Sequence, residues 1–227
     1  MWNDPDILKD GTLKNKLGII EWEELKQAEH DIGLVKLITL DEVDTTGNPV
    51  ELMKKVHKHI FEDIYSWAGN YRKINISKRE KIISGARIKY DEPSEIEGHI
   101  NQYISDMYND DWENTNLDDF AEKFARHITK IWKVHPFRDG NTRTTLAFSY
   151  IFAKQHGVDL NMGIIMNNLS REKDEKTDRI TKYSIRDRLV LSAFEESEPA
   201  PLKKLLRSAL SKSLPEKHIE DIDEIRI

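Results

Sequence analysis

The residues best suited to chemistry lie in one stretch, KVHPFRDGNTRTT, from Lys133 to Thr145. It holds an imidazole at His135, a carboxylate at Asp139 and a guanidinium at Arg143, all within nine residues. The tripeptide Asp-Gly-Asn in its middle disfavours a helix interior, yet apolar runs flank the stretch on both sides. We therefore expect a loop that joins the C-terminus of one apolar helix to the N-terminus of the next.

Such a junction is a ready anion site, because the first turn of a helix presents free backbone N–H groups and the positive end of the helix dipole. Gly140 would let the backbone approach an anion closely, and Asn141 could cap the helix or donate its amide to an oxygen. Arg143 could hold a phosphate with paired donors, and Asp139 suits Mg2+ that bridges phosphate oxygens. His135, with an ordinary pKa of about 6.5, is the candidate base. These parts suit phosphoryl or nucleotidyl transfer.

Each of these residues also has an ordinary structural interpretation. His135 could simply end a helix, and Asp139 with Gly140 could form a plain turn. Arg143 could be solvated. Their coincidence at one loop-to-helix junction is harder to explain in this way and favours the anion site. Phe137 is expected to point into the core and anchor the loop.

Composition limits the classes of function. The chain has 227 residues, 33% of them charged and 38% hydrophobic, which is enough for one domain with a sizeable core. It has no cysteine, so disulfides and thiol chemistry are excluded. The net charge of -6 argues against nonspecific nucleic-acid binding, and no apolar run approaches the roughly 18 residues that span a bilayer. The start MWNDPDILKDG lacks a signal-peptide pattern, so we expect a cytoplasmic protein. Secretion as an effector remains an alternative, because the N-terminal sequence gives no information about a secretion signal at the acidic C-terminus.

Apolar residues recur mostly at helical spacing, which predicts an all-α domain. Helices are expected near residues 18–40, 49–67, 94–108, 117–133, 141–155, 183–197 and 201–213. Residues 71–90 differ, because β-branched and tyrosine residues partly alternate there and Lys-Arg-Glu and Ser-Gly interrupt them. We expect a short β-hairpin in that segment.

The stretch HPFRDGNTR resembles the signature of the Fic family (filamentation induced by cyclic AMP), His-x-Phe-x-Asp/Glu-Gly-Asn-Gly-Arg-x-x-Arg. The segments GTLKNKLGI, FEDIYSWAGNYRKINISK and RDRLVLSAFEESEPAPLKKLL also resemble Fic proteins, in the family's order. The resemblance covers roughly residues 10–210. It implies a Fic-type helical bundle with a short β-hairpin flap over residues 1–213, with a core at about 45–200 and an N-terminal helical extension at 1–44. Residues 214–227 are expected to be a polar, acidic tail.

The resemblance implies transfer of AMP from ATP to a Tyr, Ser or Thr hydroxyl of a target protein. His135 would be the general base, and Asp139 would hold Mg2+ between phosphates. Asn141 and Arg143 would complete the catalytic set. Nucleotide contacts would come from Arg138, Gly140, Asn141, Thr142 and Arg143.

In the same resemblance, residues 74–88 correspond to a flap that holds the target as an added strand through main-chain hydrogen bonds. The expected target-binding residues are Ile76, Lys78, Ile82 and Ile83. Lys78 falls where members often carry a flap lysine, although a solvated charge at a hairpin tip explains it equally well.

Two positions depart from the family pattern, which has a glycine where Thr142 stands and an arginine where Leu146 stands. Members of the death-on-curing branch often carry lysine at the first position and phosphorylate their target, so Thr142 leaves the direction of transfer open. The family's inhibitory pattern, Ser/Thr-x-x-x-Glu-Gly/Asn, fails at Ser197 after Ser192 and Glu196. A separate antitoxin-like inhibitor therefore stays open as a partner.

Other polar and aromatic residues receive structural interpretations. His57 and His59 are expected on a solvated helix face, His127 in a structural role, and residues 171–179 in a solvated loop or helix. The tryptophans expected to anchor the core are Trp22, Trp67 and Trp132.

Three hypotheses remain. The first is a protein adenylyltransferase, and the second is a related enzyme that transfers UMP, phosphate or phosphocholine. The third is a catalytically silent module that kept the fold. The sequence names neither the target nor the oligomeric state; it predicts no nucleic-acid or membrane partner.

Overall fold

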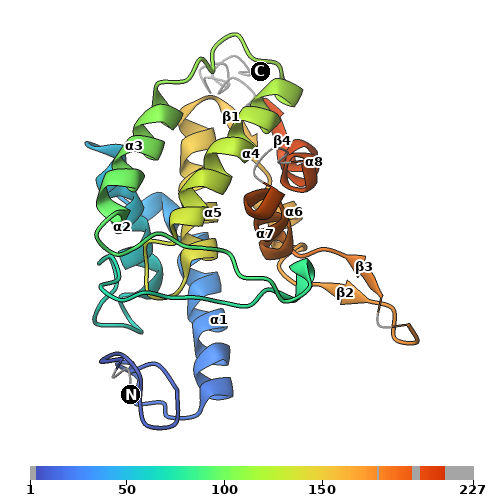
Figure 1. The fold of residues 1–227 in the computed structure, drawn as a ribbon. Helices are drawn as coiled ribbons and strands as arrows, with labels where there is room; N and C mark the ends of the chain where they lie inside the picture. The colour runs from blue at the N-terminus through green and yellow to red at the C-terminus, as the bar shows by residue number, and fades with distance from the viewer. Residues whose placement is uncertain (1–3, 178, 196–199, 213–227) are drawn as a thin grey trace, which may run out of the picture.

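The computed structural model describes residues 4–177, 179–195 and 200–212, and helices dominate them (Figure 1). The helices are α1 (Trp22–Ile38), α2 (Pro49–Phe61), α3 (Ile96–Tyr108), α4 (Leu117–Val134), α5 (Asn141–Gln155), α6 (Met162–Met166), α7 (Ile185–Glu195) and α8 (Ala200–Ala209). Two antiparallel pairs complete the regular structure of the described residues: β1 (Val158–Leu160) with β4 (Leu210–Lys212), and β2 (Glu172–Lys173) with β3 (Ile180–Lys182). The predicted all-α class is confirmed.

Helices α4 and α5 form the centre of the bundle. Figure 1 shows α2 and α3 on one side of this pair and α6, α7 and α8 on the other. Helix α4 is strongly amphipathic, and its apolar stripe is buried. Its N-terminus is capped by Asn116, whose side chain accepts from the backbone N–H groups of Asp118 and Asp119. Helix α5 is buried along most of its length, at residues 144–149 and 151–153. The loop between these two helices is therefore held at the middle of the core.

Helix α1 lies against α2 and reaches the lower end of α5 (Figure 1). Its inward face consists of Leu25, Glu29 and Gly33, which repeat every four residues. Trp22 lies outside this stripe and is 52% exposed, so the prediction that it anchors the core was wrong. Its ring instead lies under the ammonium of Lys26. None of the helices in the described part of the chain is long and apolar enough to cross a membrane.

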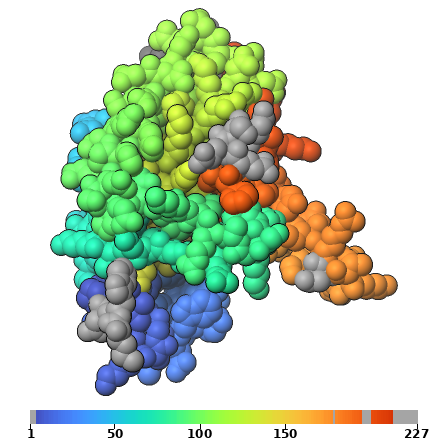
Figure 2. Space-filling view, in the orientation of Figure 1, coloured from blue at the N-terminus to red at the C-terminus, as the bar shows by residue number. Residues whose placement is uncertain are grey.

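Three local expectations need correction. Helix α2 ends at Phe61 and not near residue 67, because Ile64 and Tyr65 both donate to the Phe61 carbonyl and turn the chain. In the segment expected to be a solvated loop or helix, strands β2 and β3 pair with each other and project from the body (Figure 2). The flap at 71–90 has two extended limbs joined by a 3-10 turn at Lys81–Ile83, with a single β-bridge in place of regular strands. The expected tail at 214–227 lies outside the described residues.

Candidate active site

The loop between α4 and α5 has two residues with left-handed backbone conformation. His135 ends α4 with φ of 53°, and Gly140 begins α5 with φ of 75°. A Cβ at Gly140 would overlap the ring of Phe61. This position therefore requires glycine for packing as well as for its φ angle.

Arg72 holds the strained end of the loop in place. This buried side chain donates to the carbonyls of Val134, His135, Ile74 and Asp91, and the first two are 3.3 and 2.8 Å away. Its backbone N–H donates to the carbonyl of the residue after His135 at 2.9 Å. Sequence analysis missed this role. No local signal in the sequence separates Arg72 from its basic neighbour Lys73, and only burial in the folded chain requires its guanidinium to place its donors on acceptors.

The middle of the loop rests on His57 and Phe137. Both side chains are fully buried, and their rings stack at 3.8 Å between centroids. The N–H of Gly69 donates to His57 Nδ1 at 2.8 Å, so Nε2 carries the proton and donates to the Asp139 carbonyl at 3.2 Å. Burial lowers the pKa of His57 to about 3 and keeps the ring neutral. The prediction of a solvated His57 was wrong, whereas Phe137 anchors the loop as expected.

Asn141 has a different contact from the predicted one. Its side-chain oxygen accepts from the Phe137 N–H and its amide donates to the Phe137 carbonyl, both at 2.8 Å. Both ends of the amide are thus occupied inside the loop. Asn141 fixes the loop's shape, and the backbone N–H groups at this end of α5 are the remaining candidates to donate to an anion.

His135 has the properties of a base. Its ring is 2% exposed and stacks on Tyr90, 3.9 Å between centroids. Nδ1 lies 3.2 Å from the Trp132 carbonyl and must donate to it, so the neutral ring keeps its lone pair on Nε2. Burial lowers the pKa of His135 well below its ordinary value, and the positive charges of Lys78 and Arg186 lower it further.

Asp139 lies half-buried at the turn into α5, and its Oδ1 accepts from the Gly140 N–H at 2.5 Å. Across the residues that the structure describes, no group of three His, Cys, Asp or Glu side chains is placed to hold a metal ion. One carboxylate suits Mg2+, which commonly takes one or two carboxylates and completes its shell with phosphate oxygens and water. The donor set therefore fits a metal that arrives with a nucleotide.

Arg143 is engaged by α1. Its two terminal nitrogens donate to the Glu29 carbonyl at 3.1 Å and to Glu29 Oε2 at 2.6 Å, and its guanidinium lies over the Phe61 ring. The other carboxylate oxygen of Glu29 accepts from the Tyr65 hydroxyl. Glu29 is 9% exposed, and sequence analysis missed it. Its spacing of four from Leu25, on the apolar stripe of α1, was the available signal.

The two departures from the family pattern have packing explanations. The Thr142 hydroxyl accepts from the buried indole N–H of Trp132 at 3.0 Å, a partner that glycine could not supply. Leu146 is 3% exposed and lines an apolar cavity with Met162 and Met166.

The structure brings most of the predicted residues to one cavity of about 230 Å3. It is lined by His135, Asp139, Gly140, Asn141, Thr142 and Arg143, together with Lys78, Leu169, Ile185 and Arg186. Arg138 does not line this cavity. Its guanidinium pairs with Asp4 at 2.5 Å, so it holds the N-terminal segment against the loop.

The predicted flap residues divide into two groups. Lys78 is exposed and lines the cavity beside His135. Ile83 is buried, and Ile76 and Ile82 pack against the core, so these three side chains anchor the flap. The exposed side chains of the flap are polar.

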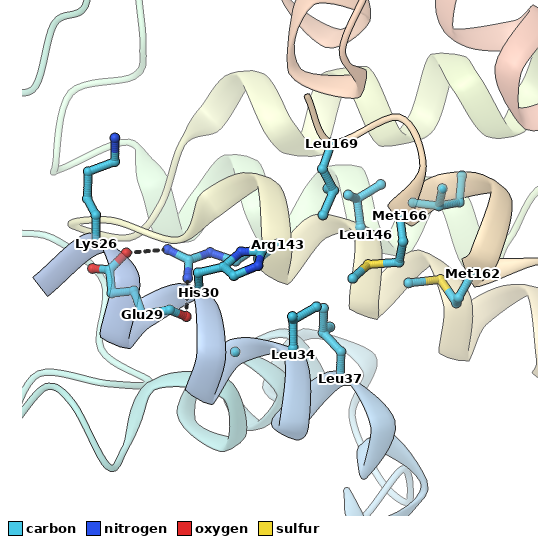
Figure 3. A pocket seen from close by; sticks show the side chains of 12 residues that line it. Lys26, Glu29, His30, Leu34, Leu37, Arg143, Leu146, Met162, Met166 and Leu169 are labelled. Carbon is cyan, nitrogen blue, oxygen red and sulfur yellow. Dashed lines mark hydrogen bonds and ion pairs between the residues drawn. The ribbon is translucent and has the colours of Figure 1, made fainter. Parts of the chain in front are cut away.

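A second cavity of about 260 Å3 lies between α1, α5 and α6. Figure 3 shows Leu34, Leu37 and the methionines at its apolar end and the Glu29–Arg143 pair at its polar end. Arg143 and Leu169 line both cavities, so the two are neighbours.

Comparison with known proteins shows what the chain resembles. Residues 48–153 match the model of the Fic/DOC family. It is 26% identical over 158 residues to the protein adenylyltransferase VbhT of Bartonella schoenbuchensis, covering 69% of this chain and 31% of VbhT. It is 29% identical over 109 residues to the probable protein adenylyltransferase y4lH of Sinorhizobium fredii, covering 47% and 53%. The chain thus spans about a third to a half of these relatives.

Solved structures share the fold. BepC of Bartonella tribocorum, solved with bound AMPPNP, has a TM-score of 0.70 at 17% identity over 92% of this chain and 98% of BepC. The N-terminal Fic domain of a VirB-translocated Bep effector of Bartonella quintana, solved with ADP, has a TM-score of 0.72 at 18% identity over 92% and 95%. These similarities confirm the Fic-type helical fold.

Proposed function

We propose that this protein is a protein adenylyltransferase that transfers AMP from ATP to a Tyr, Ser or Thr hydroxyl of a target protein. The Fic/DOC domain and the adenylyltransferase relatives support this class of reaction. Fic-fold neighbours solved with AMPPNP and ADP support a nucleotide as the substrate.

One observation carries the proposal. His135 Nδ1 is committed to the Trp132 carbonyl, so a neutral, buried ring offers Nε2 as a base in a cavity that opens on the N-terminus of α5. A structural histidine needs neither this cavity nor the neighbouring carboxylate of Asp139.

In the proposed reaction, His135 Nε2 takes the proton of the target hydroxyl. The hydroxyl oxygen forms a bond to the α-phosphorus of ATP, and the bond from that phosphorus to the bridging oxygen breaks. Pyrophosphate leaves with this electron pair. Backbone N–H groups at the start of α5 would stabilise the negative charge on the phosphate oxygens. Asp139 would hold Mg2+, which neutralises phosphate charge when bound.

To turn the outer donors of both terminal nitrogens toward the phosphate chain, Arg143 would have to release Glu29, because each of these nitrogens donates to that residue. A nucleotide offers several phosphate oxygens in exchange for one carboxylate, so this exchange is feasible.

Transfer of the terminal phosphate is the second candidate, and the cavity beside Leu146 favours it. An adenine ring seated among Leu34, Met162 and Met166 would direct the phosphate chain past Arg143 toward His135. The terminal phosphate would then be the phosphate nearest His135.

The test uses the purified chain, Mg2+ and ATP labelled at either the α- or the γ-phosphate, with a cell lysate as the source of targets. We expect α-label on protein with the wild type and with Lys204→Ala, an exposed position on α8, and none with His135→Ala. Asp139→Asn provides a second loss variant, and thermal unfolding verifies that each variant folds. Protein label from γ-labelled ATP alone would favour phosphate transfer. No label from either form would favour the silent module.

A further inference from the structure

The flap has the opposite charge to the chain as a whole. The chain carries a net charge of -6, whereas residues 73–89 contain six basic residues and one acidic residue. The basic residues are Lys73, Lys78, Arg79, Lys81, Arg87 and Lys89, and the acidic residue is Glu80. Positive charge on this acidic protein is therefore concentrated in the flap, whose Lys78 lines the active-site cavity.

These basic side chains are available to a partner. All six are exposed, and within the part of the chain that the structure describes none of them forms an ion pair. Glu80 is instead neutralised by Arg186 of α7, at 2.5 Å. The positive field of the flap thus has no compensating partner on the flap itself. Asp91 and Glu92 follow immediately, and Asp91 pairs with His99.

The flap also has the geometry of a docking site for an extended chain. Its inward side chains Ile83, Ile88 and Tyr90 are buried and hold it to the body. Residues 75–77 form no backbone-to-backbone hydrogen bond with any other described residue, so their N–H and C=O groups are open. A groove of about 300 Å3 runs between residues 75–77 and 87–90 and ends at Glu92. Open backbone groups on an extended limb are what an added strand requires.

We propose that the flap selects a target segment rich in Asp and Glu around the hydroxyl to be modified. This inference rests on the proposed function, since it names the class of target for the same site. Main-chain pairing along residues 75–77 would bind any extended peptide, and the basic side chains would make acidic peptides bind better. Lys78, which lines the cavity with His135, marks the end of the flap where the hydroxyl would enter.

Charge favours a protein target over a nucleic acid. The flap is a short basic strip on a chain whose net charge is -6, and a long polyanion that extended beyond it would meet the repulsion of the acidic body. A short acidic segment of a folded protein can lie on the strip alone.

The test measures peptide binding to the full chain by fluorescence anisotropy. One probe is a short labelled peptide with a single tyrosine flanked by glutamates, and the other carries glutamines in place of the glutamates. The variant Lys73→Glu/Lys89→Glu reverses two flap charges without touching the cavity. Lys130→Glu/Lys204→Glu reverses two exposed charges on α4 and α8 and serves as the control.

We expect the acidic peptide to bind the wild type and the control variant at least about tenfold more tightly than the glutamine peptide, and more weakly as salt rises. The flap variant should lose this preference. Equal binding of the two peptides, equal losses in the flap and control variants, or binding of a single-stranded RNA in place of the acidic peptide would each overturn the proposal. Binding needs no transfer step, so these outcomes stand apart from the labelled-ATP test of the proposed function.

Discussion

The loop between α4 and α5 and the flap each contain a non-glycine residue with positive φ, but one of these residues is buried and the other is exposed. His135 in the loop has φ of 53° and Ser84 in the flap has φ of 56°. His135 is buried and held by Arg72, whereas Ser84 is exposed and lies at the end of a single 3-10 turn. The loop is thus imposed by distant residues, and the flap turn is mainly local. A loop that is fixed by long-range contacts therefore lies beside a turn whose conformation is set by its own residues.

The largest expected effect comes from removing the support of the loop. Arg72→Ala leaves buried carbonyls of Val134 and His135 without their donor, so we expect a loss of about 3 kcal/mol in the free energy of unfolding. Urea denaturation measures it. Arg79→Ala in the flap is the control and should change stability by less than about 0.5 kcal/mol. Equal effects would mean that the loop is no better held than the flap.

Low pH should decrease the free energy of unfolding, because His57, on which the loop rests, is buried as a neutral ring. The pKa of His57 in the folded protein is about 3, below the ordinary value of about 6.5. Between these two pH values, the unfolded chain therefore binds a proton at His57 that the folded chain does not bind. Stability is therefore full above about pH 6.5 and falls as pH decreases toward 3, by about 2 kcal/mol between pH 6.5 and 5. Urea denaturation at both pH values tests this expectation. His57→Gln should reduce the dependence without abolishing it, because the pKa of the buried His135 is lowered in the same direction.

A smaller effect should follow from releasing Arg143. Glu29→Gln keeps an acceptor for Tyr65 but removes the charge that holds the guanidinium. If Arg143 then binds phosphate more readily, transfer from labelled ATP should rise roughly fivefold to tenfold. Glu23→Gln, an exposed position in the first turn of α1, should have no effect. Unchanged or lower activity in Glu29→Gln would show that the pair supports the active form.

The smallest effect is expected in the flap turn. Ser84→Gly removes the cost of a left-handed conformation for a side chain that makes no buried contact, so stability should change by less than about 1 kcal/mol, in the stabilising direction. Thermal unfolding measures it. A clear destabilisation would mean that the flap turn, like the loop, depends on contacts of its side chain.

Much of the scaffold could be predicted because its signals are local. The bounds of α5 and the first residue of α4 agree with the sequence prediction, since periodicity involves residues within a few positions of one another. The flap's β-hairpin was predicted from alternation over residues 71–90, but the structure has only the Arg79–Arg87 bridge there. Alternation of apolar and polar residues indicates that one face of an extended segment is buried. It does not require that the segment pairs with another strand.

The sequence by itself determined the chemistry that this chain carries: the residue types of the loop, their order at a helix N-terminus, and the helices on either side. Only the tertiary structure decided which hydrogen-bond and ion-pair partners those groups have. It placed Arg72 on a carbonyl 63 residues away and Glu29 on an arginine 114 residues away, and it turned the Asn141 amide into the loop. Helix signals act between near neighbours, whereas a buried charge or amide takes whichever partner the folded chain brings within hydrogen-bond distance.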